Sequence, residues 1–160
     1  MNLSYDLMVF QPEAVPRDRE KFFEWFRLVT RWAEGHDYND PRNTTPALQA
    51  WYQEMIKTFP AMNGPDGVVA DDPRFDSGYV TGYCCASNAI YLDFRWSVQE
   101  EAYRHVLMYA AKHQVGFFDV SASDGAVWQP TSDGYKVVHG GSPGDQDLVK
   151  QVAAWFKSRM

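Results

Sequence analysis

The histidines are the first residues to test for chemistry, because an oriented imidazole transfers protons near neutral pH. His36 lies between Glu34 and Asp37, either of which could hold its ring. The surrounding segment is a predicted loop with glycine and aspartate, so a surface histidine is the simpler interpretation. His105 and His113 are eight residues apart on one predicted helix, too far for the adjacent-turn pairing of a helical zinc site. We therefore predict that no histidine is catalytic.

Carboxylates are the second group with chemical potential. Asp71, Asp72 and Asp76 could offer oxygen ligands to a divalent cation, but their segment lacks the pattern of a calcium-binding loop. Asp6 would be a functional candidate if it were buried, whereas pairing with a neighbouring arginine is the simpler interpretation. The chain has no phosphate-binding glycine motif and no nucleophile elbow. We predict no metal, no cofactor and no enzymatic activity.

Two cysteines, Cys84 and Cys85, are adjacent in the sequence. Neighbouring cysteines rarely reach disulfide geometry without strain, and no zinc-binding spacing accompanies them. On a strand their side chains point to opposite faces, so we expect one buried and one surface thiol, both reduced. Gly78 and Gly82 in the same predicted strand mark a bulge or a place of close packing.

The net charge is concentrated between Glu34 and Asp76. This segment holds eight acidic and three basic residues, a net charge of −5 out of −6 for the whole chain. An acidic surface with aromatic anchors suits a basic protein partner and repels the phosphates of nucleic acid. A solvated acidic face that only keeps the protein soluble is the alternative. The predicted partner-binding residues are Glu34, Asp37, Tyr38, Asp40, Trp51, Met62, Asp66, Asp71, Asp72, Phe75 and Asp76.

The length of 160 residues fits a single domain with a substantial core. No apolar window is long enough for a transmembrane helix, so we expect no membrane association. The first ten residues lack a basic region, which argues against a secretory signal. We expect a cytoplasmic protein.

Turn and capping signals divide the chain into elements. One helix is predicted from Pro16 to a glycine cap at Gly35, and another from Pro46 to Phe59 with Thr45 as its N-cap. A third helix begins at the capping box Ser97–Glu100 and ends near His113. Residues 61–77 form a long connection. The predicted strands are residues 3–10, 78–86, 89–94, 115–120 and 126–129.

A glycine-rich hinge at about 139–145 precedes a last predicted helix. The order of elements is then β-α-α-β-β-α-β-β-α. This order predicts an α+β fold, with an antiparallel or mixed sheet, helices packed mainly on one face, and a split β-α-β-like sandwich.

Several short strings resemble a known group of proteins. They are Ser4–Phe10, Pro16–Arg19, Trp32–Pro41, Thr45–Gln49, Glu54–Ile56, Phe59–Pro65 and Gly116–Ser121. Over about residues 3–130 the chain resembles small acidic cytoplasmic immunity proteins of interbacterial toxin systems, including those of type VI secretion. The resemblance implies a stoichiometric inhibitor that binds a cognate toxin, often a nuclease. It brings no catalytic motif and no site residues.

Two other hypotheses stay open. A small-molecule-binding or enzymatic domain could use a sheet face that carries Tyr79, Tyr83, Tyr91, Asp93 and Arg95. A homo-oligomer could instead pair through an exposed strand edge at residues 126–129.

Overall fold

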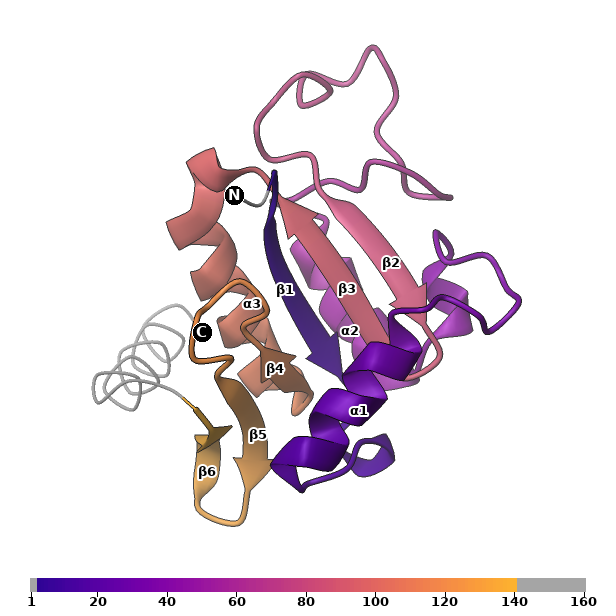
Figure 1. Ribbon diagram of the computed structural model, residues 1–160. Coiled ribbons are helices and arrows are strands. Elements are labelled where there is room, and N and C mark those ends of the chain that lie inside the picture. Colours follow the sequence, from indigo (N-terminus) through magenta and orange to yellow (C-terminus); the bar gives the residue numbers. More distant parts are fainter. Residues whose placement is uncertain (1–2, 141–160) are drawn as a thin grey trace.

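The structure, a computed structural model, describes residues 3–140. Six strands form one antiparallel sheet in the order β2-β3-β1-β4-β5-β6 (Figure 1). The strands are β1 (Tyr5–Phe10), β2 (Gly82–Ala86), β3 (Ala89–Phe94), β4 (Gly116–Phe118), β5 (Val127–Thr131) and β6 (Gly134–His139). The helices are α1 (Arg19–Val29), α2 (Pro46–Met55) and α3 (Gln99–His113), with short 3-10 turns at Pro12–Ala14, Pro41–Asn43 and Trp96–Val98. The predicted α+β fold with an antiparallel sheet is confirmed.

The centre of the sheet has the predicted split β-α-β arrangement. β3 and β4 both pair antiparallel with β1, so they run parallel to each other on its two sides. The crossover between them is α3. β1 is therefore a central strand. Because it is the first strand of the chain, residues near the N-terminus lie beside residues of β3, which begins at Ala89.

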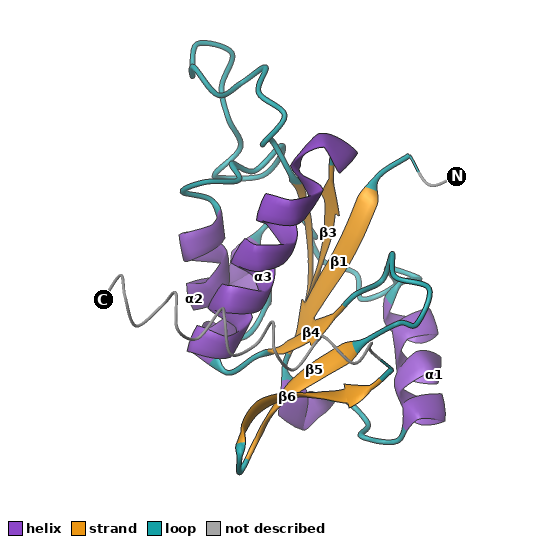
Figure 2. Cartoon of the chain, turned by 90° about the vertical axis from the view of Figure 1, so that its left-hand side faces the viewer, coloured by secondary structure: helices purple, strands orange, loops and turns teal. Residues whose placement is uncertain are grey.

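Helices cover both faces of the sheet (Figure 2). α2 and α3 pack on the face to which Leu7 and Val9 point, and this cluster is the larger part of the core. α1 packs on the opposite face through Phe22, against Met8 and Phe10. The prediction of helices mainly on one face thus describes α2 and α3, while α1 makes a second, smaller core.

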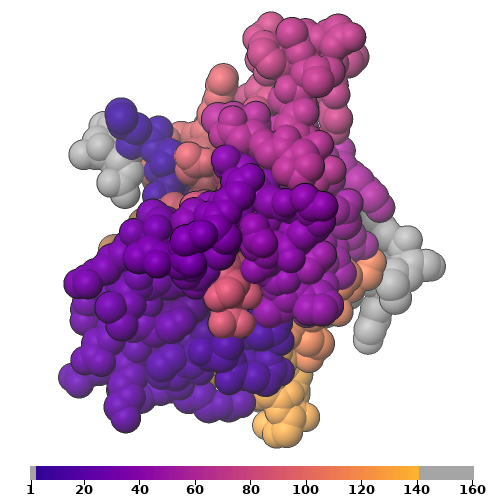
Figure 3. Space-filling view, turned by 90° about the vertical axis from the view of Figure 1, so that its right-hand side faces the viewer, coloured from indigo at the N-terminus to yellow at the C-terminus, as the bar shows by residue number. Residues whose placement is uncertain are grey.

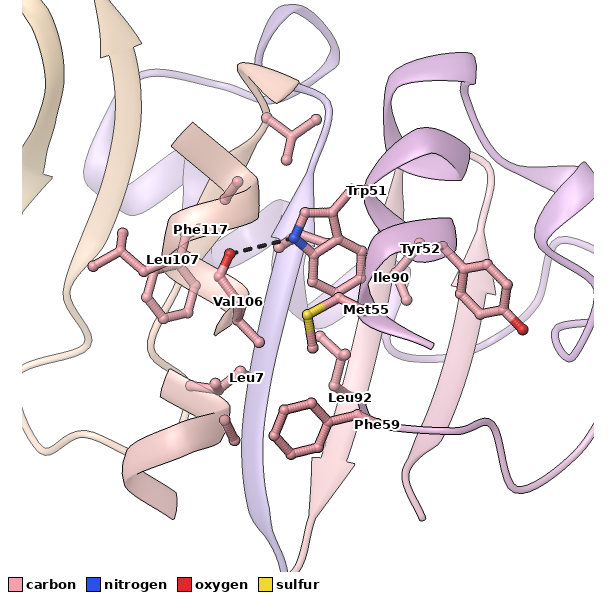
Figure 4. Packing of buried hydrophobic residues seen from close by; sticks show 14 of the residues in the cluster. Leu7, Trp51, Tyr52, Met55, Phe59, Ile90, Leu92, Val106, Leu107 and Phe117 are labelled. Atoms are coloured by element: carbon pink, nitrogen blue, oxygen red, sulfur yellow. Dashed lines mark hydrogen bonds between the residues drawn. The ribbon is translucent and has the colours of Figure 1, made fainter. Parts of the chain in front are cut away.

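Trp51 lies at the centre of the larger core (Figure 4). Its side chain is fully buried, and its indole Nε1 donates a hydrogen bond of 3.3 Å to the carbonyl of Val106, which ties α2 to α3. The prediction of Trp51 as a partner-binding residue is therefore wrong. It shares its helix face with Leu48 and Met55, and burying that apolar face stabilises the fold.

Local signals placed one helix start correctly and two incorrectly. Thr45 caps α2 as predicted, accepting a hydrogen bond of 3.2 Å from the backbone of Leu48. α1 begins at Arg19, with Asp18 as its N-cap, so Pro16 lies before the helix, and Gly35 lies beyond its end at Val29. The capping box at Ser97–Glu100 does not form, because Ser97 lies inside a 3-10 turn and Val98 occupies the N-cap position.

The strand predictions need three corrections. β2 begins only at Gly82, because Thr81 leaves the ladder and pairs with Ala61 instead. A sixth strand, β6, was missed, although Asp133-Gly134 is a typical hairpin signal; the turn is formed by Ser132 and Asp133, and Gly134 begins the strand. β5 lies between β4 and β6, so the proposed exposed edge at residues 126–129 is wrong. Most of the predicted hinge at 139–145 and the last helix lie outside the described residues.

No helix within residues 3–140 is long and apolar enough to cross a bilayer.

Candidate functional site

An open cleft of about 670 Å³ lies on the α1 side of the sheet. Its floor comes from β1, β2 and β3, and the C-terminal end of α1 with the following turn forms one wall. The remaining side is a rim built from the two loops that follow α1 and α2. The lining residues are Asp6, Phe26, Thr30, Trp32, Asn39, Met62, Asn63, Gly82, Tyr83, Cys84, Tyr91, Asp93 and Val120.

Two carboxylates lie together on the floor. Asp6 of β1 and Asp93 of β3 are direct partners in the antiparallel register, so their side chains project on the same face. Asp6 accepts a hydrogen bond of 2.6 Å from the hydroxyl of Ser4 and another from the hydroxyl of Tyr91. The arginine partner that the sequence suggested for Asp6 is not among its hydrogen bonds or ion pairs within residues 3–140.

The Asp93 carboxylate sits over Gly82, its register partner on β2. A Cβ added at Gly82 would lie 1.8 Å from Asp93 Oδ1, so only glycine leaves room for the carboxylate in this position. The predicted close packing at Gly82 is confirmed. Partial burial and the nearby charge of Asp6 raise the pKa of Asp93, against the opposing effect of backbone hydrogen bonds.

The cleft carries uncompensated negative charge. Like charges directly opposite each other on neighbouring strands destabilise a sheet. In the described part of the chain, no lysine, arginine or histidine lines the cleft to offset Asp6 and Asp93. A cationic ligand group would supply the missing charge.

An aromatic wall stands beside the carboxylates. The ring of Trp32 meets the rings of Tyr38 and Tyr91 edge to face, at centroid distances of 5.4 Å and 6.0 Å. Trp32 has a φ of 53°, a left-handed conformation that a bulky residue rarely adopts. Burial, followed by the hydrogen bond to Asp6, raises the pKa of Tyr91, so its hydroxyl remains a donor.

The two loops at the rim, residues 34–45 and 61–77, hold most of the acidic residues of the segment and are called the acidic loops. They are joined to each other and to the edge of the sheet. The amide of Cys85 in β2 donates to the carbonyl of Tyr38, at 2.7 Å, and the amide of Met62 donates to the carbonyl of Thr81, at 2.9 Å. Gly64 is pressed against the backbone of Asn39, with space for no side chain. In Figure 3 the magenta loop of residues 61–77 projects from the body and abuts the purple segment 31–45.

Several predicted partner-binding acids hold the loops in shape. Glu34 accepts hydrogen bonds from the backbone and hydroxyl of Ser87, at 2.8 and 2.9 Å, and lies 2.7 Å from His36 Nε2. Asp37 accepts a hydrogen bond from the backbone of Asn39, at 2.9 Å. The hydrogen bond to Glu34 raises the pKa of His36. The imidazole thus belongs to the same set of contacts as Glu34 and Ser87.

Other acids of the segment have local partners. Asp40 pairs with Arg42 and Asp72 with Arg74, at 2.6 and 3.0 Å. Asp66 accepts a hydrogen bond of 3.1 Å from the hydroxyl of Tyr52. These interactions shape the loops, and the acids remain near solvent.

Exposed apolar side chains mark the loop of residues 61–77. Met62 is 50% exposed and Phe75 43% exposed, and Met62 also lines the cleft. Asp71 and Asp76 lie exposed on the same loop. Tyr38 packs against Trp32 rather than projecting freely. Of the predicted residues, Met62 thus lies at the cleft, and Phe75, Asp71 and Asp76 on the loop beyond it.

The residues proposed for a ligand-binding sheet face are only partly together. Tyr91 and Asp93 line the cleft. Tyr83 borders it, but its hydroxyl donates to the carbonyl of Phe59 in the opposite core, at 2.7 Å. Tyr79 lies elsewhere and bonds Glu101, and Arg95 is exposed beyond the end of β3. Alternation along β2 turns Tyr83 toward the opposite face, whereas Tyr79 and Arg95 lie outside the two strands.

The two cysteines lie on opposite faces, as predicted. Cys84 is partly buried in the cleft, Cys85 is fully buried in the larger core, and both are free thiols. Burial raises the pKa of Cys84 to about 11 and that of Cys85 to about 12. Both thiols therefore stay protonated near neutral pH and are poor nucleophiles.

Sequence reasoning considered Asp6 and Asp93 separately and missed that they face each other. It also missed Trp32 as a wall residue, because its spacing fitted the apolar face of a longer helix. Residues 3–140 contain no group of three or more histidine, cysteine or acidic side chains arranged to hold a metal ion. Comparison with models of protein families, with curated proteins and with solved structures finds no match to this chain.

Proposed function

We propose that this chain is a cytoplasmic immunity protein that binds and neutralises a basic toxin. Its binding surface is the acidic cleft together with the loops of residues 34–45 and 61–77. The observation that carries the proposal is the facing pair Asp6 and Asp93 on the floor of an open cleft, with no basic residue among those that line it. A basic group of the partner would supply the positive charge that balances these two carboxylates.

The rim suits a protein rather than a nucleic acid. Exposed Met62 and Phe75 supply apolar contact area beside the acidic side chains. The acidic field would speed encounter with a basic surface and repel a phosphate backbone. A nuclease toxin presents a basic substrate-binding surface, which this face would cover.

The test is capture of the partner with tagged protein from a lysate of the source bacterium, followed by a toxicity assay. We expect a basic protein in stoichiometric amount that stops growth when expressed alone and is harmless when expressed with this chain. A captured protein whose toxicity does not change on co-expression would contradict the proposal. Failure to recover any stoichiometric partner would also count against it.

A second candidate function is a small-molecule-binding domain. The cleft volume of about 670 Å³ lies within the range of ligand pockets, roughly 300–1,000 Å³, and its lining combines aromatic rings with a few polar groups. A screen of amines, nucleotides, sugars and amino acids for a rise in melting temperature tests this candidate. A flat result across the screen would remove it.

A further inference from the structure

We infer that the cleft binds a guanidinium group between the carboxylates of Asp6 and Asp93 and the ring of Trp32, and that an arginine side chain of the partner supplies it. The identity of the partner rests on the proposed function, whereas the chemistry of the cleft stands on its own geometry. The argument depends on the two carboxylates, the aromatic wall and the rigidity of both.

The carboxylates present acceptors to an incoming cation. Asp6 uses one oxygen for Ser4 and the other for Tyr91, so its orientation is set before any ligand arrives. A carboxylate oxygen has two acceptor lone pairs, so each keeps one for a ligand. Asp93 opposes Asp6 directly in the register, and its carboxylate over Gly82 places a second acceptor group in the same cleft.

The lining favours a planar cation over a metal ion or a compact ammonium. Residues 3–140 contain no cluster of three or more metal-binding side chains, so the two carboxylates lack the further protein oxygens that a calcium site draws on. A guanidinium has five donors in a plane, so it can bridge two carboxylates while its face stacks on an aromatic ring. Phe26, Met62 and Val120 give apolar contacts for the methylene stem of an arginine.

The aromatic wall is held in place from behind. Trp32 leans on Tyr38, whose hydroxyl accepts a hydrogen bond of 2.6 Å from the backbone of Glu34. Glu34 is in turn bonded to Ser87 at the β2–β3 turn. The strained backbone of Trp32 is thus fixed by its neighbours, which is common where a side chain serves a binding site. A preformed cleft loses little entropy on binding.

The surroundings favour a side chain of a protein over a free guanidinium compound. The cleft is open, and exposed Met62 and the acidic loop of residues 61–77 lie at its rim. A protein that inserts one arginine would cover this rim with its own surface, and a free small molecule would leave it exposed to water. Charge complementarity points the same way, because the partner that the acidic loops select is basic.

The first experiment measures which probe occupies the cleft. Amide spectra of the labelled protein are recorded during titration with N-acetyl-arginine methylamide, with the lysine equivalent and with the uncharged citrulline equivalent. We expect shift changes centred on Asp6, Trp32 and Asp93, and an affinity for the arginine probe about tenfold above that for citrulline and above that for lysine. Equal response to arginine and citrulline, or shifts centred outside the cleft, would overturn the inference.

Variants test the same residues. Asp93→Asn should weaken binding of the arginine probe by about tenfold, because a charge-assisted pair becomes a neutral contact. Trp32→Leu should weaken it while both carboxylates remain. The matched control is Asp133→Asn, an exposed acid on the β5–β6 turn that does not line the cleft. Unchanged melting curves establish that each variant is folded, and a folded Asp93→Asn protein with unchanged probe affinity would contradict the inference.

The second experiment uses the captured partner. Asp93→Asn should raise its dissociation constant by at least about tenfold, and Asp133→Asn should leave it unchanged. If the partner binds both variants equally, the partner's arginine is not the occupant and the inference is overturned, although the proposed function would stand. Agmatine, a free guanidinium compound, is titrated in the same way as the arginine probe. If it binds far more tightly, the occupant of the cleft is a small molecule and the inference of a partner arginine fails. The proposed function fails separately, if the captured protein is not toxic.

Discussion

Gly82 and Asp93 show how one register position restricts two residues. The carboxylate of Asp93 fills the space that a side chain at Gly82 would need. Asp93 is accessible to solvent, yet desolvation in the cleft and the neighbouring charge of Asp6 raise its pKa, so placing this carboxylate here costs free energy. At the scale of the residue, the site therefore keeps a destabilising pair of acidic side chains in the cleft.

Gly82→Ala should destabilise the protein by about 1–3 kcal/mol, because the new methyl group collides with Asp93 Oδ1 at 1.8 Å. Urea unfolding measures the change. Asp93→Ala added to Gly82→Ala should recover most of the loss, since the colliding atoms are gone. The control is Gly78→Ala, where the nearest atom is the Ser97 hydroxyl at 3.3 Å. An equal loss at both glycines would contradict the explanation.

At the scale of the element, hydrogen bonds and ion pairs join parts that the sequence separates. Glu54 of α2 lies 2.6 Å from His113 Nε2 and also pairs with Lys112, both at the end of α3. Although burial acts to raise it, the pKa of Glu54 is lowered by the hydrogen bonds from Lys112 and His113. Together with the Trp51 hydrogen bond to Val106, this network fixes the packing of α2 against α3.

Glu54→Gln should lower the free energy of unfolding by about 1 kcal/mol at pH 7, since the pair is partly exposed. A lowered native pKa means that the ionised carboxylate stabilises the fold above the unfolded pKa of about 4.3 and loses this effect as pH falls through the native value. The difference between wild type and variant should therefore shrink below pH 4. Urea unfolding across pH checks it, with exposed Glu24→Gln as control. A difference that does not change with pH would refute the ion pair.

Helix capping supplies a second prediction at this scale. Thr45→Ala should cost about 1 kcal/mol, because the threonine hydroxyl accepts the hydrogen bond from the Leu48 amide. Ser97→Ala should change stability by less than about 0.5 kcal/mol, because the exposed serine makes no cap hydrogen bond to α3. Thermal unfolding of both variants checks the pair. A large loss at Ser97 would show that the capping box forms after all.

At the scale of the whole molecule, the acidic loops lie together beside the cleft, and their field acts at a distance. The segment from Glu34 to Asp76 carries −5 of the net charge of −6. Local pairs such as Asp40 with Arg42 orient some of these side chains without removing the excess. Because exposed charges act over roughly a Debye length, about 10 Å at 0.1 M salt, such a surface affects encounter more than the lifetime of a complex.

The association rate with the proposed toxin should fall by about tenfold or more as salt rises from about 20 mM to about 300 mM, with a much smaller change in dissociation. Surface plasmon resonance measures both rates. Asp71→Asn with Asp76→Asn should lower the rate at low salt and flatten its salt dependence, and both acids are exposed on the loop. An association rate that does not respond to salt would mean that the acidic loops do not steer the partner.

The sequence by itself determined the features that depend on neighbouring residues. Thr45-Pro46 starts α2, the apolar residues of β3 alternate with polar ones, and Ser87-Asn88 turns the hairpin. Hydrogen bonds and side-chain periodicity within one segment encode all three. Asp133-Gly134 was an equally local signal, and the strand it introduces was overlooked. Trp51 was also within reach, because its spacing from Leu48 and Met55 marks a buried helix face.

Only the tertiary structure decided the site. Asp6 lies near the N-terminus and Asp93 near the middle of the chain, and the register of β1 against β3 alone brings them face to face. The contact of Gly64 with Asn39, which joins the two acidic loops, also brings together residues that are distant in the sequence. A shift of one residue in the register of β1 against β3 would turn every side chain of the shifted strand to the other face. The position of each carboxylate therefore depends on how the whole sheet packs. Pairings between distant residues are set by burial of the entire core, which no local pattern specifies.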